Sequence, residues 1–492
     1  MNIKINDESF AYDVFGLVQA FYPGTKPKMF IDKEADASEE TVAIFISEDR
    51  ITLTIDGGSF HSVSIDPKDR ADTKNRLKRL IYETLSDRTK KTLPWGTLTG
   101  IRPTKIPYKK LYENKTKEEI FSFMEDTYLC TPEKIRLAYA IARREKEAVG
   151  DTKDRYALYI GIPFCPSICL YCSFSSYPYG VYKDRVEAYL DALIKEIRFV
   201  GDHFHDRILD TVYIGGGTPT SLSAEELERL LGAVDAHLDL SRLREYTVEA
   251  GRPDSVTEEK LKVLLKHGVN RISINPQTMQ DKTLKKIGRF HSTEDIRKAY
   301  GVARALSDAD IKKGGRGFLI NMDLIVGLPG ENKEDIRDTL EQVKAMEPDN
   351  LTVHSLAIKR SSRLHEMLTE YEDELFLNSN EIMDMVYGYA DSMGMQPYYL
   401  YRQKQISGNM ENVGFAPDKK ECLYNMEIME ELLDIVAIGA GSDCKKVEKY
   451  ADGQTDLRRK VERCENVKDV DAYIERIDEM IERKKTLFKT ET

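Results

Sequence analysis

The sequence predicts an α/β protein whose central part is a partial (β/α)6 barrel, and three observations support this fold class. From about residue 155, short apolar runs alternate with amphipathic stretches, which is typical of strands joined by helices. Each strand–helix unit is long enough for a parallel crossover. Chemically suggestive residues fall where the apolar runs end, and parallel α/β folds carry their sites there. A doubly wound sheet would show the same alternation, so this alternative stays open.

Residues 1–92 predict a small N-terminal α/β domain. Its expected elements are a strand at 1–6, a helix at 12–21, strands at 41–47 and 50–55, and a charged helix at 71–91.

Residues 93–154 are expected to form a linker followed by helices. The run from Leu93 to Pro103, Leu-Pro-Trp-Gly-Thr-Leu-Thr-Gly-Ile-Arg-Pro, contains the chain's one tryptophan. Its proline and glycine content favours a rigid, packed linker, and a lid or substrate contact is the alternative. Two helices are expected within 116–150.

The barrel is expected to span residues 155–362. Six parallel strands are predicted at 157–162, 211–214, 245–249, 271–275, 318–326 and 351–356. Helices between them are predicted at 183–200, 224–238, 258–266 and 334–346.

Residues 363–492 are expected to form a mainly helical C-terminal domain on the substrate side. An extended insert begins at Pro397, and we expect the segment 397–416 to lie across the barrel mouth. The last stretch, 469–489, predicts an amphipathic, solvated closing helix.

Composition limits the class of protein. Hydrophobic residues make up 41% of 492 residues, which is enough for two or three cores. No apolar run reaches membrane-span length, and the first residues lack a signal-peptide pattern. The net charge of −11 makes a general nucleic-acid role unexpected. Seven cysteines in so long a chain do not suggest a disulfide scaffold. We therefore expect a cytoplasmic protein without a membrane span.

Three cysteines, Cys165, Cys169 and Cys172, lie on one short loop after the first barrel strand. Three thiolates can hold three irons of a four-iron, four-sulfur cube and leave the fourth iron open for a small molecule. Zinc is the competing interpretation, but no second Cys-x-x-Cys pair follows. Three buried structural thiols are the weakest interpretation, because Pro163 and Pro166 indicate a loop.

The Cys-x-x-x-Cys-x-x-Cys spacing, the preceding apolar run 156–162 and the aromatic Tyr171 resemble the radical S-adenosylmethionine (SAM) superfamily. That resemblance implies a [4Fe-4S] cluster whose open iron binds SAM. It also implies that one electron from the cluster cleaves SAM to a 5′-deoxyadenosyl radical.

Polar residues at the later strand ends recur in the order known from the coproporphyrinogen oxidase-like branch of that superfamily. The Gly215-Gly-Gly-Thr loop suits a close backbone approach to a ligand. An arginine fork suits a carboxylate, and SAM carries one. The resemblance implies SAM contacts from Tyr159, Gly216, Gly217, Thr218, Glu249, Gln277, Arg289, Asp323, Ile325 and Ala357.

Two further stretches, 93–103 and 398–416, look like the HemZ-type oxygen-independent coproporphyrinogen dehydrogenases. That family implies oxidative decarboxylation of coproporphyrinogen III to protoporphyrinogen IX in heme biosynthesis, with a tetrapyrrole substrate and a low-potential electron donor. Substrate contacts are expected from Tyr401, Arg402 and Lys404, with Arg102 and Lys105 as further cations for propionates. Tyr398 and Tyr399 are expected to offer flat faces to the macrocycle.

This chain departs from the branch at Gly161, where histidine is usual, and at Phe174, where the well-studied oxidases carry another cysteine. Two rival functions therefore stay open. One is a heme-binding chaperone of the same branch, which Phe174 favours. The other is a radical SAM heme-degrading methyltransferase.

Overall fold

The computed structural model describes the chain except residues 23–24, 26, 34–38, 59, 67, 101, 151, 404–409, 449–459 and 490–492. Its contacts divide the chain into two compact units. Unit 1 comprises Met1–Arg143 and Tyr401–Lys404, and unit 2 comprises Arg144–Leu400 and Gln405–Thr492. None of the described helices combines the length and the apolar character that a membrane crossing needs.

Unit 1 is built on a five-stranded sheet in the order β2-β1-β3-β4-β5. Strand β1 is parallel to β2 and β3, and β3, β4 and β5 form an antiparallel meander. Helices α1 and α2 pack against each other and share one apolar core with the sheet. The predicted elements of this region are confirmed, and short β2 and β5 are additional. Their bounds are β1 Asn2–Ile5, α1 Ala11–Phe21, β2 Lys28–Ile31, β3 Thr41–Ile46, β4 Arg50–Ile55, β5 Phe60–Ser64 and α2 Arg70–Thr89.

Three more helices follow in the chain: α3 Lys105–Tyr112, α4 Lys117–Tyr128 and α5 Pro132–Val149. The turn before them is packed rather than exposed, since Trp95 is 1% exposed. Gly96 has φ +55°, and a Cβ there would stand 2.0 Å from the carbonyl oxygen of Tyr128. Only glycine fits this approach, so the turn-rich stretch is a rigid part of unit 1.

Unit 2 is built on an eleven-stranded sheet with six central parallel strands. These are β6 Arg155–Ile162, β9 Ile208–Gly216, β10 Glu245–Glu249, β11 Arg271–Ser273, β12 Leu319–Val326 and β13 Asn350–Ser355. Between them lie α6 Tyr179–His203, α7 Ala224–His237, α8 Glu258–Lys266, α9 Asp281–Lys286, α10 Thr293–Lys312 and α11 Lys333–Met346. All six predicted strands are confirmed.

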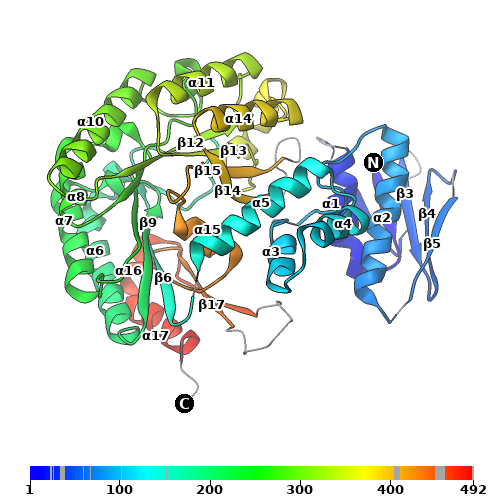
Figure 1. Ribbon diagram of the computed structural model, residues 1–492, viewed down its shortest axis with the longest axis horizontal. Helices are drawn as coiled ribbons and strands as arrows, with labels where there is room; N and C mark the ends of the chain where they lie inside the picture. Colours follow the sequence, from blue (N-terminus) through cyan, green and yellow to red (C-terminus); the bar gives the residue numbers. More distant parts are fainter. Residues whose placement is uncertain are drawn as a thin grey trace. The chain divides into compact units, whose positions relative to one another are not determined.

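The order of these strands separates the barrel from the doubly wound alternative. Neighbours in the sheet are also consecutive parallel strands in the chain, with no reversal of order. Right-handed crossovers between such strands place every helix on the same face. Figure 1 shows α6, α7, α8, α10 and α11 along the outside of the curved sheet. A doubly wound sheet would need a switch point, so the partial barrel is confirmed.

The C-terminal third contains the predicted helices and also extends both edges of the sheet. Strand β15 pairs antiparallel with β13, and β16 pairs parallel with β6. The two ends of the insert form β14 and β15 at a sheet edge. Residues 404–409 of the insert are outside the described residues, so the expectation that it lies across the barrel mouth stays a prediction. The bounds are α12 Arg363–Glu366, α13 Leu368–Tyr371, α14 Asn380–Ser392, β14 Gln396–Tyr401, β15 Asn412–Ala416, α15 Leu423–Glu430, β16 Asp434–Ile438, β17 Asp443–Val447, β18 Val461–Glu465, α16 Val470–Glu475 and α17 Ile477–Leu487.

The expected solvated closing helix is two helices with one buried side, and this corrects the expectation. Tyr473, Met480 and Lys484 are 0% exposed. Lys484 Nζ lies 2.7 Å from Glu196 Oε1 on α6, and Tyr473 OH donates to Glu196 Oε2 at 2.6 Å. The charged residues of this stretch predicted exposure to solvent, but the ion pair with Glu196 allows Lys484 to be buried.

We expect Lys484→Met to lower the free energy of unfolding by about 3 kcal/mol, because it leaves a buried carboxylate without its cation. Urea unfolding followed by circular dichroism measures this change. The matched variant Glu196→Gln/Lys484→Met removes both charges and should recover most of the loss. A single variant within about 0.5 kcal/mol of wild type would show that the pair carries no stabilising energy.

Candidate functional site

The cysteine loop follows β6 and closes with the short parallel pair β7 Phe164–Cys165 and β8 Tyr177–Pro178. Cys169 is buried, and Cys165 and Cys172 are half-buried. The backbone N–H of Cys172 donates to the carbonyl of Cys169 at 3.2 Å, so the last two cysteines share one turn. The predicted thiols are therefore on one compact loop.

This loop is fixed by its neighbours. The N–H of Leu170 donates to the carbonyl of Ile287 at 2.9 Å, and Ser167 Oγ donates to the carbonyl of Gly288 at 3.0 Å. The carbonyl of Leu170 accepts from the N–H of Leu364 at 2.9 Å. Hydrogen bonds from two distant chain segments thus hold the thiols in position.

The glycine loop after β9 lies directly against the cysteines. The N–H of Gly217 donates to the carbonyl of Ile162 at 2.8 Å. A Cβ on Gly217 would stand 2.6 Å from Phe164 O and 2.9 Å from Cys165 Sγ, so no side chain fits. Thr218 Oγ1 lies 3.5 Å from Cys165 Sγ. Gly216, whose φ is +112°, completes the turn.

Burial raises the pKa of the Cys165 thiol to about 11 and also raises the pKa of Cys172. Metal binding must therefore displace protons from these thiols. Among the described residues, no three His, Cys, Asp or Glu side chains converge as ligands of a single ion. A closed zinc site takes four ligands, whereas a cube takes three thiolates, one on each of three irons. The three thiols of the loop suit the cube.

Arg289 is a buried cation beside the loop, and 5% of it is exposed. Its Nη1 donates to the carbonyl of Asn275 at 2.5 Å, and its Nη2 donates to Tyr171 OH at 3.3 Å. Its Nε has no hydrogen-bond partner among the described residues. An unsatisfied buried N–H is costly, and a ligand carboxylate would satisfy it.

Two carboxylates, Glu249 at the end of β10 and Asp323 within β12, lie on strands of the barrel. Glu249 Oε1 accepts from Tyr213 OH at 2.5 Å. Burial raises the pKa of Glu249 to about 7, and the charge of Asp323 adds to this shift. Burial also acts to raise the pKa of Asp323, but hydrogen bonds from His354 and Asn321 outweigh it, so that pKa is lowered. The two groups thus differ in charge state near neutral pH.

Gln277 holds a strained backbone position between these groups, with φ +67°. Its N–H donates to the carbonyl of Asp323 at 2.9 Å, and its carbonyl accepts from the N–H of Ile325 at 2.9 Å. No described residue hydrogen-bonds its buried Oε1. A non-glycine residue in this region is often functional, since the surroundings must hold it there.

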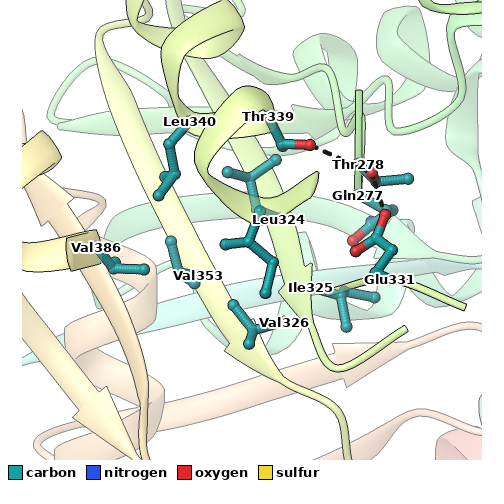
Figure 2. A pocket seen from close by; sticks show the side chains of 11 residues that line it. Gln277, Thr278, Leu324, Ile325, Val326, Glu331, Thr339, Leu340, Val353 and Val386 are labelled. Atoms are coloured by element: carbon teal, nitrogen blue, oxygen red, sulfur yellow. Dashed lines mark hydrogen bonds between the residues drawn. The ribbon is translucent and has the colours of Figure 1, made fainter. Parts of the chain in front are cut away.

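A small cavity of about 10 Å³ lies beside Gln277 and Ile325 (Figure 2). Glu331 accepts from Thr278 Oγ1 at 2.5 Å in its wall, and burial raises the pKa of Glu331 to about 7. Such a space holds about one water molecule. It is a packing gap next to the site and cannot admit a substrate.

Tyr159 lies in a stack of three tyrosines inside the barrel. Its ring centroid is 6.2 Å from Tyr213 and 6.2 Å from Tyr424, and the last two are 4.5 Å apart. Because Tyr213 also bonds Glu249, the stack supports that carboxylate. Tyr213 and Tyr424 were missed by the sequence reasoning. The apolar–polar alternation along β9 could have indicated Tyr213, whereas no sequence pattern indicates Tyr424.

Two further residues predicted to contact SAM, Ile325 and Ala357, lie at the end of β12 and after β13. Ile325 is in an apolar cluster with Leu170 of the cysteine loop and Leu356. Ala357 follows β13 and is half-buried. The structure thus brings the cysteines and the strand-end residues onto connected loops of unit 2.

The predicted substrate residues are placed differently. Tyr401 and Arg402 belong to unit 1, where Arg102 and Lys105 also lie, and Lys404 is outside the described residues. Arg402 Nη1 donates to the carbonyl of Leu98 at 2.7 Å, and its guanidinium lies 6.0 Å from the Trp95 ring centroid. The two signature stretches therefore meet at Arg402.

Tyr398 and Tyr399 are 1% and 4% exposed on β14, so their rings cannot lie against a macrocycle. This corrects the expectation for both residues. They pack against each other with ring centroids 4.9 Å apart. Both side chains are buried although β14 is the outermost strand of the sheet.

Comparisons with known proteins show which proteins the chain resembles. Residues 159–343 match the Radical SAM superfamily. The oxygen-independent coproporphyrinogen-III oxidase-like protein HemZ of Bacillus subtilis is 40% identical over 84% of this chain and 80% of its own length. The heme chaperone HemW of the same organism is 35% identical over 44% of this chain, and the chain spans 57% of it.

A solved structure supports the fold. The coproporphyrinogen III oxidase HemN of Escherichia coli, described as a radical SAM enzyme, superposes with a TM-score of 0.51 at 22% identity. The match covers 68% of this chain and 72% of that one. At this identity the likeness concerns the fold alone.

Proposed function

The chain belongs to the family of the oxygen-independent coproporphyrinogen-III oxidase-like protein HemZ, within the radical SAM superfamily, and from this premise we propose that it oxidatively decarboxylates coproporphyrinogen III to protoporphyrinogen IX. The observation that carries the proposal is the 40% identity over 84% of the chain. A second support is the meeting of the two HemZ-type stretches at Arg402 and Leu98.

We assign Cys165, Cys169 and Cys172 to a [4Fe-4S] cluster, and the strand-end residues to SAM. When bound, the cluster and SAM supply a one-electron cleavage that yields a hydrogen-abstracting radical. The protein orients these groups and keeps water away. Gly217 lets the glycine loop pack directly against the cysteine loop. Arg289 offers a buried N–H donor to a carboxylate, and Glu249 offers an acceptor to ribose hydroxyls.

A second candidate is a heme chaperone, which one observation favours. Phe174 occupies the position two residues after Cys172, and it is 73% exposed. A large apolar side chain exposed beside a site suits contact with a flat apolar ligand. The identity to HemW over 44% of the chain is consistent with this candidate.

An anaerobic assay with coproporphyrinogen III, SAM and a chemical reductant tests the proposal. Protoporphyrinogen as the product supports the dehydrogenase. In a parallel incubation with heme, bound heme without turnover of coproporphyrinogen supports the chaperone. Consumed heme, with a methyl group of SAM transferred to the heme-derived product, supports the heme-degrading methyltransferase.

We expect SAM affinity to rise with pH and to level off above about pH 8. The carboxylate form of Glu249 accepts hydrogen bonds from ribose hydroxyls, and its raised pKa of about 7 leaves it largely protonated at pH 6. Affinity should therefore be about tenfold weaker at pH 6 than on the plateau. Calorimetric titration across pH 5.5–8.5 measures this. Glu249→Gln should flatten the profile, and an unchanged profile in that variant would assign the titration to another group.

We expect Arg402→Ala to raise the KM for coproporphyrinogen and to slow decarboxylation. Arg402 is itself 4% exposed and donates to the carbonyl of Leu98, so the change should act by releasing the 93–103 stretch, and loss of this charge-assisted bond costs about 1.5–3 kcal/mol. SAM cleavage without substrate should stay near wild type. Lys262→Ala, which removes an exposed cation paired with Glu258 on α8, is the charge control. Loss of the cluster or of folding in Arg402→Ala would make the residue a structural element of unit 1.

A further inference from the structure

A second buried arginine lies beside the cysteine loop, and no role was expected for it. Arg252 follows β10 in the segment Glu249-Ala-Gly-Arg-Pro, and 3% of it is exposed. We infer that Arg252 is a positioning residue that raises the reduction potential of the cluster through its contact with Cys169. The inference rests on the cluster assigned under the proposed function.

The guanidinium of Arg252 is aimed at one thiol. Its Nη1 lies 3.0 Å from Ser167 Oγ and 3.6 Å from Cys169 Sγ, and it donates to both. A distance of 3.6 Å is within the range of an N–H···S hydrogen bond, because sulfur is large. Arg252 thus reaches two neighbouring positions of the cysteine loop at once.

The other side of the guanidinium is clamped by Asp254. Arg252 Nε donates to Asp254 Oδ1 at 2.9 Å, and Nη2 donates to Oδ2 at 2.7 Å. This two-point geometry fixes the plane of the fork. The carboxylate is therefore on the far side of the guanidinium from Cys169, so the thiol meets the positive end of the pair.

The backbone of Arg252 is also fixed. Its carbonyl accepts from the N–H of Ser255 at 2.9 Å and from Ser255 Oγ at 2.7 Å. Ser255 Oγ lies 2.6 Å from Thr220 Oγ1, just beyond the glycine loop. The arginine is thus tied to both loops that border the thiols.

The hydrogen bonds of Arg252 indicate a positioning role rather than a ligand contact. A guanidinium has five N–H donors, and four bonds are made to Asp254, Ser167 and Cys169. Arg289 differs, because its Nε has no partner among the described residues. Arg289 also lies against Cys169, but its Nε is open to a SAM carboxylate, whereas the bonds of Arg252 go to the cysteine loop and to Asp254.

The physical effect follows from charge. Reduction adds an electron to a cluster, and hydrogen bonds and positive charge at its sulfurs stabilise that reduced state. Burial strengthens the effect, because few waters screen the guanidinium. Arg252 donates to Cys169, whereas Cys165 Sγ has the hydroxyl of Thr218 at 3.5 Å. We therefore expect Arg252 to make the first electron easier to accept.

The test is an EPR-monitored redox titration of the anaerobically reconstituted full-length protein. Arg252→Gln should reduce the equilibrium constant for one-electron reduction about tenfold, equal to a shift of about −59 mV. Arg252→Lys keeps the charge and loses the fork, so its shift should have the same sign and be smaller. Asp254→Asn removes the opposing negative charge and should shift the potential upward.

Arg271→Lys is the matched control, because Arg271 is also 3% exposed and pairs with Glu245 at the opposite end of the barrel strands. It should change the stability of the protein and leave the potential unchanged. If Arg252→Gln loses its cluster, Arg252→Lys and Asp254→Asn still decide the matter. Wild-type potentials in those two variants, with four irons bound, would overturn the role of Arg252. Absence of a cluster in the wild type would overturn the proposed function itself.

Discussion

Replacing Cys165, Cys169 or Cys172 with alanine is expected to abolish both the cluster and SAM cleavage. A cube bound by three thiolates has no spare ligand, because its fourth iron is the one that binds SAM. The effect should be complete in each single variant. Iron and sulfide analysis and visible absorption after anaerobic reconstitution measure it.

Cys130→Ala and Cys464→Ala are the matched controls, and both should keep the cluster. Cys130 is buried in unit 1, where its thiol donates to the carbonyl of Trp95 at 3.3 Å. Cys464 is half-buried on β18. A variant lacking all three loop cysteines that still bound four irons with wild-type absorption would refute the cluster assignment.

Arg289→Ala is expected to weaken SAM binding by about tenfold to a hundredfold while the cluster stays intact. The lost charge-assisted hydrogen bond is at a buried position, where it contributes about 1.5–3 kcal/mol. Glu249→Ala should have an effect of similar size. Calorimetry on reconstituted protein measures both affinities.

Arg289→Lys separates charge from geometry. Lysine keeps the positive charge but cannot reproduce the fork that reaches Asn275, Tyr171 and a ligand together. The SAM affinity of Arg289→Lys should lie between those of wild type and Arg289→Ala. Wild-type SAM affinity in both Arg289→Ala and Glu249→Ala would show that these residues support the barrel and do not bind SAM.

The barrel could be predicted from the sequence because its elements follow a simple period. Strand β10 and helix α8 were predicted with the bounds that the structure has, since an apolar strand and an amphipathic helix have different repeats. Strands β15 and β16 were not predicted. Every residue of both is buried, and a buried run of five residues has no alternation that distinguishes strand from helix.

Residues that act through tertiary contacts could not be predicted. Arg252 is a charge in a loop, and only the fold shows that it meets Cys169. Lys484 looks like a solvated lysine until Glu196 on a distant helix is seen to pair with it. Tyr398 and Tyr399 lie in a run without regular apolar–polar alternation. The sequence therefore did not show that both would be buried in a strand at the edge of the sheet. Spacing identified the thiols, because ligands on one loop are local in sequence.

The proposed function requires that hydrogen is removed from a propionate side chain of coproporphyrinogen III before carbon dioxide leaves. The most direct measurement uses coproporphyrinogen III deuterated at the β-carbons of its propionates, with SAM, a reductant and a one-electron acceptor under anaerobic conditions, because formation of each vinyl group releases an electron. We expect deuterium in the 5′-deoxyadenosine that is formed, together with protoporphyrinogen and released carbon dioxide. Cleavage of SAM with no deuterium in 5′-deoxyadenosine and no vinyl product would overturn the proposed function.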